Sequence, residues 1–157
     1  MGKSAIIKRY VYNIFNQDTL PTIGMNISFK DIILENRKKV KLKIIDTAGE
    51  EQYKAITKSY YKNADGVFFV FALDDIKSFQ NIKTWINNFN ENHIKYNDKH
   101  IIPKYLIGNK SDIILDKDVV KKELIEKLLK ENNIEHYETT SAKENKNIDK
   151  IFQEIMN

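Results

Sequence analysis

The 157-residue sequence has no cysteine, only two prolines and five glycines, and no apolar run of about 18 residues. Without cysteine it has no disulfide, no thiolate metal site and no C-terminal cysteine to prenylate. It also lacks a segment that would span a bilayer, and its start lacks the charged, apolar and small-residue regions of a signal peptide. We therefore expect a cytoplasmic protein with no transmembrane segment.

The composition is that of one globular domain. Hydrophobic residues make up 41% of the chain, enough to form a core at this length. The formal net charge of +4 comes from lysines spread along the sequence, with Arg37-Lys38-Lys39 as the densest cluster. Because no basic stretch is interleaved with aromatic residues, we expect no nucleic-acid partner.

Helical and strand patterns alternate along the chain. The predicted strands are 25–34, 40–45, 67–73, 105–107 and 136–139, and the predicted helices are 3–15, 79–89, 120–128 and 148–155. The first two strands flank a polar turn, as in a hairpin, whereas each later strand leads into a helix. This order predicts an α/β fold with a mainly parallel sheet and helices on both faces.

Ligands of such sheets bind at the carboxyl ends of the strands, where two polar motifs stand. In Asp46-Thr47-Ala48-Gly49 the carboxylate suits Mg²⁺, usually held through water, and the glycine lets a backbone N–H approach a phosphate; the alternative is a surface turn. In Asn109-Lys110-Ser111-Asp112 the last carboxylate can accept from the N1–H and exocyclic amine of guanine. The alternative is a chance match in a chain rich in Asn and Lys.

Three further segments support a nucleotide site through their order along the chain. Gly2-Lys3-Ser4 opens the first helix as the second half of a phosphate-binding loop does, and Thr22 in Pro21-Thr22-Ile23-Gly24 offers a hydroxyl to Mg²⁺. A backbone N–H in Thr140-Ser141-Ala142-Lys143 can donate to guanine O6. Each segment alone is an ordinary turn or helix entry. Their common order with the two motifs after the strands argues against coincidence and predicts a guanine-nucleotide site.

Over essentially its whole length the sequence resembles the Ras superfamily of small GTPases, and within it the Rab branch. The Rab features are PTIG before a strand, DTAGEEQY, SYYKNADG, and DDIKSFQNIKTW after the buried strand. The resemblance implies the P-loop GTPase fold and a GTP/GDP switch of vesicle trafficking. It also implies a monomer at the periphery of endomembranes that binds exchange factors, activating proteins and effectors through residues 16–26 and 47–61.

The resemblance also implies roles for individual residues. Gly2 and Lys3 would contact the phosphates, Ser4 and Thr22 would ligate Mg²⁺, and Asp46 would hold the ion through water. The residues that would contact the guanine base are Phe15, Asn109, Lys110, Asp112, Ser141, Ala142 and Lys143.

Departures from the family pattern concern hydrolysis and partners. Gly49 would sense the γ-phosphate, but Glu50 occupies the position of the glutamine that orients the attacking water. Its carboxylate either repels the γ-phosphate and slows hydrolysis or acts as a base, and we expect altered turnover. Ile45 replaces the tryptophan of Rab proteins, so binding of typical Rab effectors is not implied.

The ends of the sequence depart further. Gly2 follows Met1 directly, so the apolar strand and the first glycine of GxxxxGK(S/T) are missing, and no tail follows Asn157. Relative to the family, residues 1–157 would be a single G domain truncated at both ends, without its N-terminal central strand and with weakened nucleotide binding. The alternative is a degenerate GTPase fold that acts by protein contacts; a P-loop nucleotide kinase is disfavoured because it has no use for the Asn109–Asp112 turn.

Overall fold

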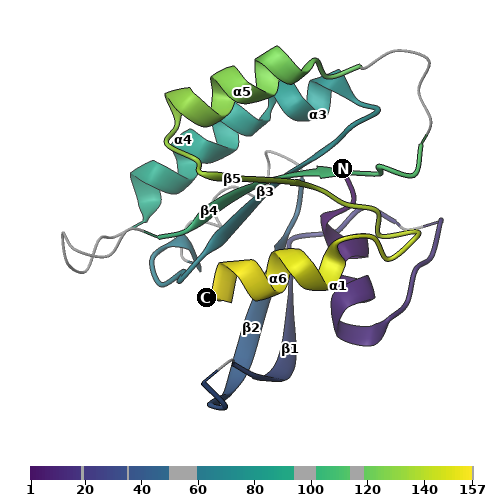
Figure 1. The fold of residues 1–157 in the computed structure, drawn as a ribbon, viewed down its shortest axis with the longest axis vertical. Coiled ribbons are helices and arrows are strands. Elements are labelled where there is room, and N and C mark those ends of the chain that lie inside the picture. The colour runs from purple at the N-terminus through teal and green to yellow at the C-terminus, as the bar shows by residue number, and fades with distance from the viewer. Residues whose placement is uncertain (19, 35, 50–59, 94–101, 114–118, 157) are drawn as a thin grey trace.

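The computed structural model describes residues 1–18, 20–34, 36–49, 60–93, 102–113 and 119–156 (Figure 1). Its helices are α1 (Lys3–Tyr12), α3 (Ile76–Gln80), α4 (Ile82–Asn92), α5 (Lys122–Glu131) and α6 (Ile148–Met156). Its strands are β1 (Met25–Ile33), β2 (Lys39–Thr47), β3 (Val67–Ala72), β4 (Lys104–Asn109) and β5 (His136–Thr139). The predicted order of strands and helices is confirmed, and the strand at 136–139 has the predicted bounds.

The strands form two separate sheets in the described part of the chain. β3, β4 and β5 are parallel, in that order, with Val70 opposite Ile107 and Ile107 opposite Glu138. β1 and β2 form an antiparallel hairpin in which Met25 pairs with Thr47. The α/β class is therefore confirmed, but hydrogen bonds do not join the hairpin to the parallel sheet as they would in one continuous sheet.

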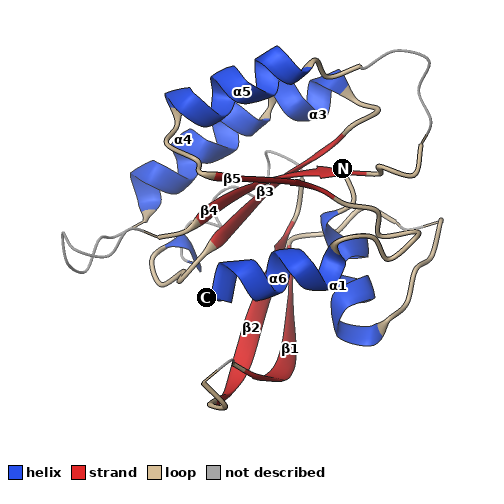
Figure 2. Ribbon diagram, viewed as in Figure 1, coloured by secondary structure: helices blue, strands red, loops and turns tan. Residues whose placement is uncertain are grey.

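Helices cover both faces of the parallel sheet (Figure 2). In the view of Figure 1, α3, α4 and α5 lie above the sheet, and α1 and α6 lie below it. Because side chains alternate along a strand, β3 sends Phe69 and Phe71 into one core and Val70 into the other. β4 contributes Leu106 to the first core and Ile107 to the second, so both layers are anchored on the same two strands.

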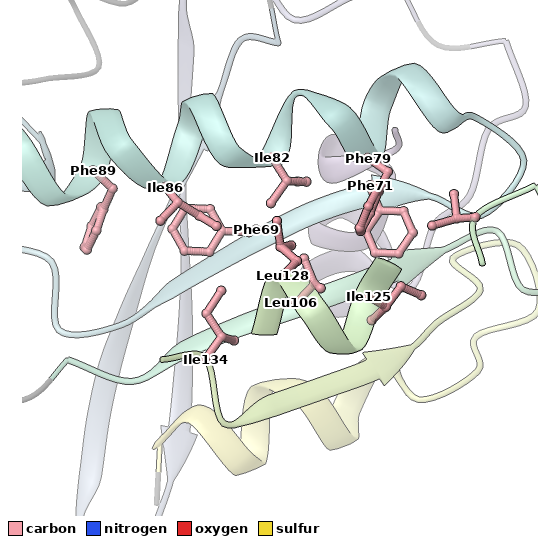
Figure 3. Packing of buried hydrophobic residues seen from close by; sticks show 11 residues of the cluster. Phe69, Phe71, Phe79, Ile82, Ile86, Phe89, Leu106, Ile125, Leu128 and Ile134 are labelled. Carbon is pink, nitrogen blue, oxygen red and sulfur yellow. The ribbon is translucent and has the colours of Figure 1, made fainter. Parts of the chain in front are cut away.

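The core under α4 shows where the helix predictions were right and where they were wrong (Figure 3). Ile82, Ile86 and Phe89 are all buried along α4, as their spacing predicts. The expected single helix is instead two, because α3 ends at Gln80 and α4 begins at Ile82. On α5 the buried residues are Ile125 and Leu128, whereas Leu124 is 44% exposed.

A groove of about 940 Å³ separates the hairpin from the parallel sheet. Its walls come from residues 40–47 on one side and 66–70 on the other, and α1 and α6 contribute further apolar side chains. At its end lie Met1, Lys3 and Asp46, so this groove borders the segment that carries the predicted phosphate-binding residues.

Candidate nucleotide and magnesium site

The start of α1 is shaped by Gly2. This residue is the N-cap and has a φ of 89°, in the left-handed region that glycine alone adopts without strain. A Cβ at Gly2 would lie 2.4 Å from Nδ2 of Asn109, so a side chain does not fit there. The backbone N–H groups at a helix start carry partial positive charge and suit an anion. The local conformation thus matches the predicted phosphate contact.

Lys3, the first residue of α1, lies beside the end of β2. Burial lowers the pKa of Lys3, although the nearby carboxylate of Asp46 opposes this shift. A Cβ built on Gly49 would lie 3.5 Å from Nζ of Lys3 and 3.0 Å from Cε of Met1. Lys3 and Gly49 are 46 positions apart in the sequence, and the structure brings them together.

Ser4, Thr22 and Asp46 converge next to Lys3, although they come from a helix, a loop and a strand. Oγ of Ser4 and Oγ1 of Thr22 share a hydrogen bond of 2.6 Å, and Thr22 Oγ1 donates to Oδ2 of Asp46 over 3.4 Å. Asp46 is only 5% exposed, and its Oδ1 has no hydrogen-bond partner. Burial raises the pKa of Asp46, while the nearby hydroxyl groups of Ser4 and Thr22 and the charge of Lys3 oppose the rise.

This donor set fits Mg²⁺. Hydroxyl and carboxylate oxygens are the ligands that the ion prefers, and it usually keeps several waters. The unpartnered Oδ1 of Asp46 is a buried acceptor that a cation or its water would satisfy. Within the described ranges no three histidine, cysteine or acidic side chains cluster as metal ligands, and the candidate donors here are two hydroxyl groups and one carboxylate.

Asn109, at the end of β4, connects the start of α1 to the end of β5. Its Nδ2 donates to the carbonyl of Met1 over 3.1 Å, and its Oδ1 accepts from Oγ1 of Thr140 over 3.1 Å. Asn109 is 2% exposed and Thr140 is fully buried, so these bonds are shielded from water. Asn109 thus fixes the start of α1, the predicted phosphate-binding segment, relative to the predicted base-binding loops.

The two loops predicted to bind guanine meet through Asp112 and Ser141. Oγ of Ser141 donates to Oδ1 of Asp112 over 2.6 Å and accepts from the N–H of Glu144 over 3.0 Å. Lys110 has a φ of 69°, and its ammonium group is 2.9 Å from Oδ2 of Asp74. This ion pair holds the Lys110 side chain across the loop that follows β3.

The remaining predicted residues are distributed as follows. Ala142 is 2% exposed and Lys143 is exposed, and their carbonyls accept from Arg9 of α1. Phe15 is half-buried against the core formed by α1 and α6, whereas Glu50 and residues 51–59 lie outside the described residues. Sequence reasoning assigned no role to Arg9, Asp74 or Thr140. Asp74 and Thr140 each follow a predicted strand and so had a positional signal, whereas Arg9 had none.

Comparison with known proteins agrees with this geometry. A model described as the Ras family matches residues 1–157. The chain belongs to the Ras family. It is 37% identical to Ras-related protein Rab-13 of Canis lupus familiaris over 155 residues, which cover 99% of the chain and 72% of that protein. It is 39% identical to Ras-related protein Rab-10 of Diplobatis ommata over 152 residues, covering 97% of the chain and 72% of that protein.

The relation to Ras-related protein Rab-8A of Bos taurus is similar, with 38% identity over 152 residues, 97% of the chain and 70% of that protein. This member of the Ras family is therefore a Rab-like small GTPase. None of the helices that the structure describes is long and apolar enough to pass through a membrane.

Proposed function

We propose that this Rab-like chain binds GTP and GDP with Mg²⁺, hydrolyses GTP, and acts as a monomeric switch in vesicle trafficking at the periphery of endomembranes. The observation that carries the proposal is the convergence of Ser4, Thr22 and Asp46 beside Lys3, with an unpartnered carboxylate oxygen among them. These residues are far apart in the sequence, and a core role would not require a buried, unpaired carboxylate oxygen.

The phosphates are held by α1 in this proposal. The N–H groups that follow Gly2 donate to phosphate oxygens, and the ammonium group of Lys3 neutralises the β- and γ-phosphates. Ser4 and Thr22 would ligate Mg²⁺, and Asp46 would hold the ion through water. The ion, when bound, would neutralise phosphate charge.

The base is recognised by the loops after β4 and β5. The Asp112 carboxylate accepts from guanine N1–H and the exocyclic amine, and Asn109 and Lys110 shape the loop that presents it. On the other side of the base, Ser141 orients Asp112, and the backbone N–H groups of Ala142 and Lys143 face O6. Phe15 packs on the edge of the ring.

In this proposal, switching depends on Thr22 and Gly49, which contact the γ-phosphate of bound GTP. With GTP bound they hold residues 16–26 and 47–61 in the form that effectors bind, and loss of the γ-phosphate releases both segments. Leu20 is 91% exposed and Ile23 is 82% exposed, so the first segment offers apolar contacts to effectors, exchange factors or activating proteins. Glu50 replaces the water-orienting glutamine and gives altered hydrolysis.

The divided sheet favours a second candidate function. Lys3 and Asp46 line the groove between β2 and β3, and in the described part of the chain no strand lies between its two walls. A less rigid phosphate site would make the chain a degenerate GTPase fold that binds nucleotide weakly and acts through protein contacts.

Nucleotide retention separates the two functions. The purified chain is incubated with GDP and Mg²⁺, desalted, denatured and assayed by chromatography for bound guanine nucleotide. We expect bound GDP with the native chain. We expect Asp112→Asn to shift the preference from GDP to xanthosine diphosphate, because the asparagine amide donates a hydrogen bond where the carboxylate accepts one. A native chain that retains no GDP, and shows no binding by titration, would favour the interaction module.

A further inference from the structure

Arg9 links two segments that border the proposed base-binding site, residues 13–15 and residues 142–143. Its Nε donates to the carbonyl of Ala142 over 2.8 Å, and its Nη2 donates to the carbonyl of Lys143 over 3.1 Å. Nη1 donates to both the carbonyl and the Oδ1 of Asn13, over 3.1 and 3.2 Å. The guanidinium carbon is also 6.0 Å from the centroid of the Phe15 ring.

We infer that Arg9 is a positioning residue for guanine recognition, which holds the peptide between Ala142 and Lys143 so that the Lys143 N–H faces the O6 atom of the base. The inference rests on the proposed function and adds to it a residue with no place in the nucleotide-binding motifs. Arg9 itself does not touch the nucleotide. It acts through the loop that does.

The orientation of the loop follows from peptide geometry. In a trans peptide the carbonyl and the N–H of the next residue point in opposite directions. Because the Ala142 carbonyl points to Arg9, the Lys143 N–H points to the opposite side. The next peptide confirms the arrangement, since the Lys143 carbonyl also points to Arg9 and the Glu144 N–H donates to Oγ of Ser141 over 3.0 Å.

That opposite side is where Asp112 lies. Ser141, which accepts from the Glu144 N–H, donates to Oδ1 of Asp112 over 2.6 Å. The turn is closed by a pair of backbone hydrogen bonds between Ser141 and Lys146. The Lys143 N–H is therefore directed to the side of the turn that faces the base-reading carboxylate.

The position of Arg9 is fixed by the residue that follows it. Tyr10 is buried and stacks on Phe152 of α6 with ring centroids 3.7 Å apart, which sets the rotation of α1 against α6. Arg9 is thereby directed at the turn that precedes α6. Arginine suits this position because its planar group carries five N–H donors in a fixed fork, whereas lysine has one compact head group.

The same side chain acts on the Phe15 side of the site. Asn13 is the C-cap of α1 with a φ of 55°, and Arg9 bonds both its carbonyl and its side chain. This contact fixes the direction in which the chain leaves α1 toward Phe15. Arg9 thus bonds to both of the segments that would contact the base from different sides.

The first test compares Arg9→Gln and Arg9→Lys with Lys8→Gln, an exposed neighbour on α1. GDP release from the Mg²⁺ complex is measured by stopped-flow fluorescence. We expect about tenfold faster release for Arg9→Gln, since hydrogen bonds to a charged group are lost, a smaller increase for Arg9→Lys, and no change for Lys8→Gln. Equal release rates in the native chain and Arg9→Gln would overturn the inference.

The second test separates positioning from a general loss of structure. 6-Thio-GDP changes only the O6 acceptor to sulfur, a weaker acceptor, and inosine diphosphate lacks only the exocyclic amine read by Asp112. In Arg9→Gln we expect the preference for GDP over 6-thio-GDP to fall by about threefold or more, with the preference over inosine diphosphate unchanged. A uniform loss for all three nucleotides would leave Arg9 a purely structural residue and overturn the inference.

A third measurement needs no nucleotide. Amide hydrogen exchange of Glu144 reports the peptide that Arg9 orients, and exchange of Trp85, bonded to Asn81 in another layer, reports the fold. Arg9→Gln should speed exchange at Glu144 only. Failure of the native chain to bind GDP would refute the proposed function, whereas GDP binding that Arg9→Gln leaves unaltered would refute the inference alone.

Discussion

The hydroxyl of Ser141 donates to Oδ1 of Asp112 over 2.6 Å and thereby joins the loops that follow β4 and β5. Ser141 is fully buried, and the Ser111 N–H donates to the Thr140 carbonyl over 2.9 Å beside it. The carboxylate is therefore held in one orientation by two loops before any base arrives. Such preorganisation lowers the entropic cost of binding.

Ser141→Ala removes that hydroxyl and should weaken GDP binding by about tenfold, because a hydrogen bond to a charged group contributes about 1.5–3 kcal/mol. Titration calorimetry measures the affinity. Ser28→Ala, a change of the same kind on β1, is the control and should bind GDP as the native chain does. An unaltered affinity for Ser141→Ala would mean that Asp112 needs no support from this loop.

Asp46 gives a pH-dependent prediction. Burial raises the pKa of Asp46, so the unfolded state gives up this proton at lower pH than the folded state does. Its contribution to stability is then fully present below the ordinary pKa of an aspartate and is lost as the pH rises through the raised value. We therefore compare the free energy of unfolding without Mg²⁺ and nucleotide as the pH rises from acidic to neutral. It should fall less in Asp46→Asn than in the native chain.

With GDP present, the same variant should respond differently to Mg²⁺. The neutral amide cannot orient the water of the ion as a carboxylate does, so we expect Mg²⁺ affinity to fall by about 10- to 100-fold. Thermal unfolding over a pH series without Mg²⁺ and nucleotide measures the first effect, and thermal unfolding over a Mg²⁺ titration with GDP measures the second. Asp31→Asn on the exposed surface of β1 is the control. An equal Mg²⁺-dependent rise in Tm for Asp46→Asn would contradict the magnesium assignment.

Gly2 and Gly24 form a matched pair for backbone strain. Both have a positive φ, 89° and 70°, but a Cβ at Gly2 would meet Nδ2 of Asn109 at 2.4 Å, whereas Gly24 has nothing within 4 Å. Gly24→Ala should cost about 1 kcal/mol from the left-handed conformation alone. Gly2→Ala should cost more, because Asn109 must also move and its bond to Met1 is disturbed.

Denaturant unfolding measures both free energies, and the difference between the variants isolates the steric effect at Asn109. Equal losses in the two variants would show that the Asn109 side chain moves aside freely. The tight packing of Gly2 against Asn109 would then have no energetic consequence.

Local patterns predicted much of the fold. The apolar run at 67–73 indicated a strand buried on both faces, and 105–107 was predicted as a strand. β3 and β4 occupy these positions, and helices cover both sides of their sheet. The break between α3 and α4 was not predicted. Asp75 caps α3 by accepting from the Ser78 N–H, and the chain restarts at Ile82 within an unbroken apolar periodicity. Periodicity alone does not report such a break.

The candidate site likewise has residues that the sequence predicted and residues that it did not. The chemistry of Asp46 and Asp112 was readable because both follow predicted strands, where the carboxyl edge of a sheet collects ligands, and Lys3 was readable because it opens the first predicted helix. Glu50, the predicted catalytic residue, lies outside the described part of the chain, so its role stays a prediction. Arg9 gave no signal, because an arginine in an amphipathic helix reads as part of a solvated face.

The sequence by itself determined the alternation of strands and helices and the residue types that follow the strands, because both depend on local spacing and on the chemistry of single side chains. Only the tertiary structure decided which of those residues meet: Ser4 with Thr22 and Asp46, and Arg9 with Ala142. It also decided that the hairpin and the parallel sheet stand apart, with a groove between them. These contacts join residues 18 to 133 positions apart, and the packing of α1 and α6 on one face of the sheet sets their distances.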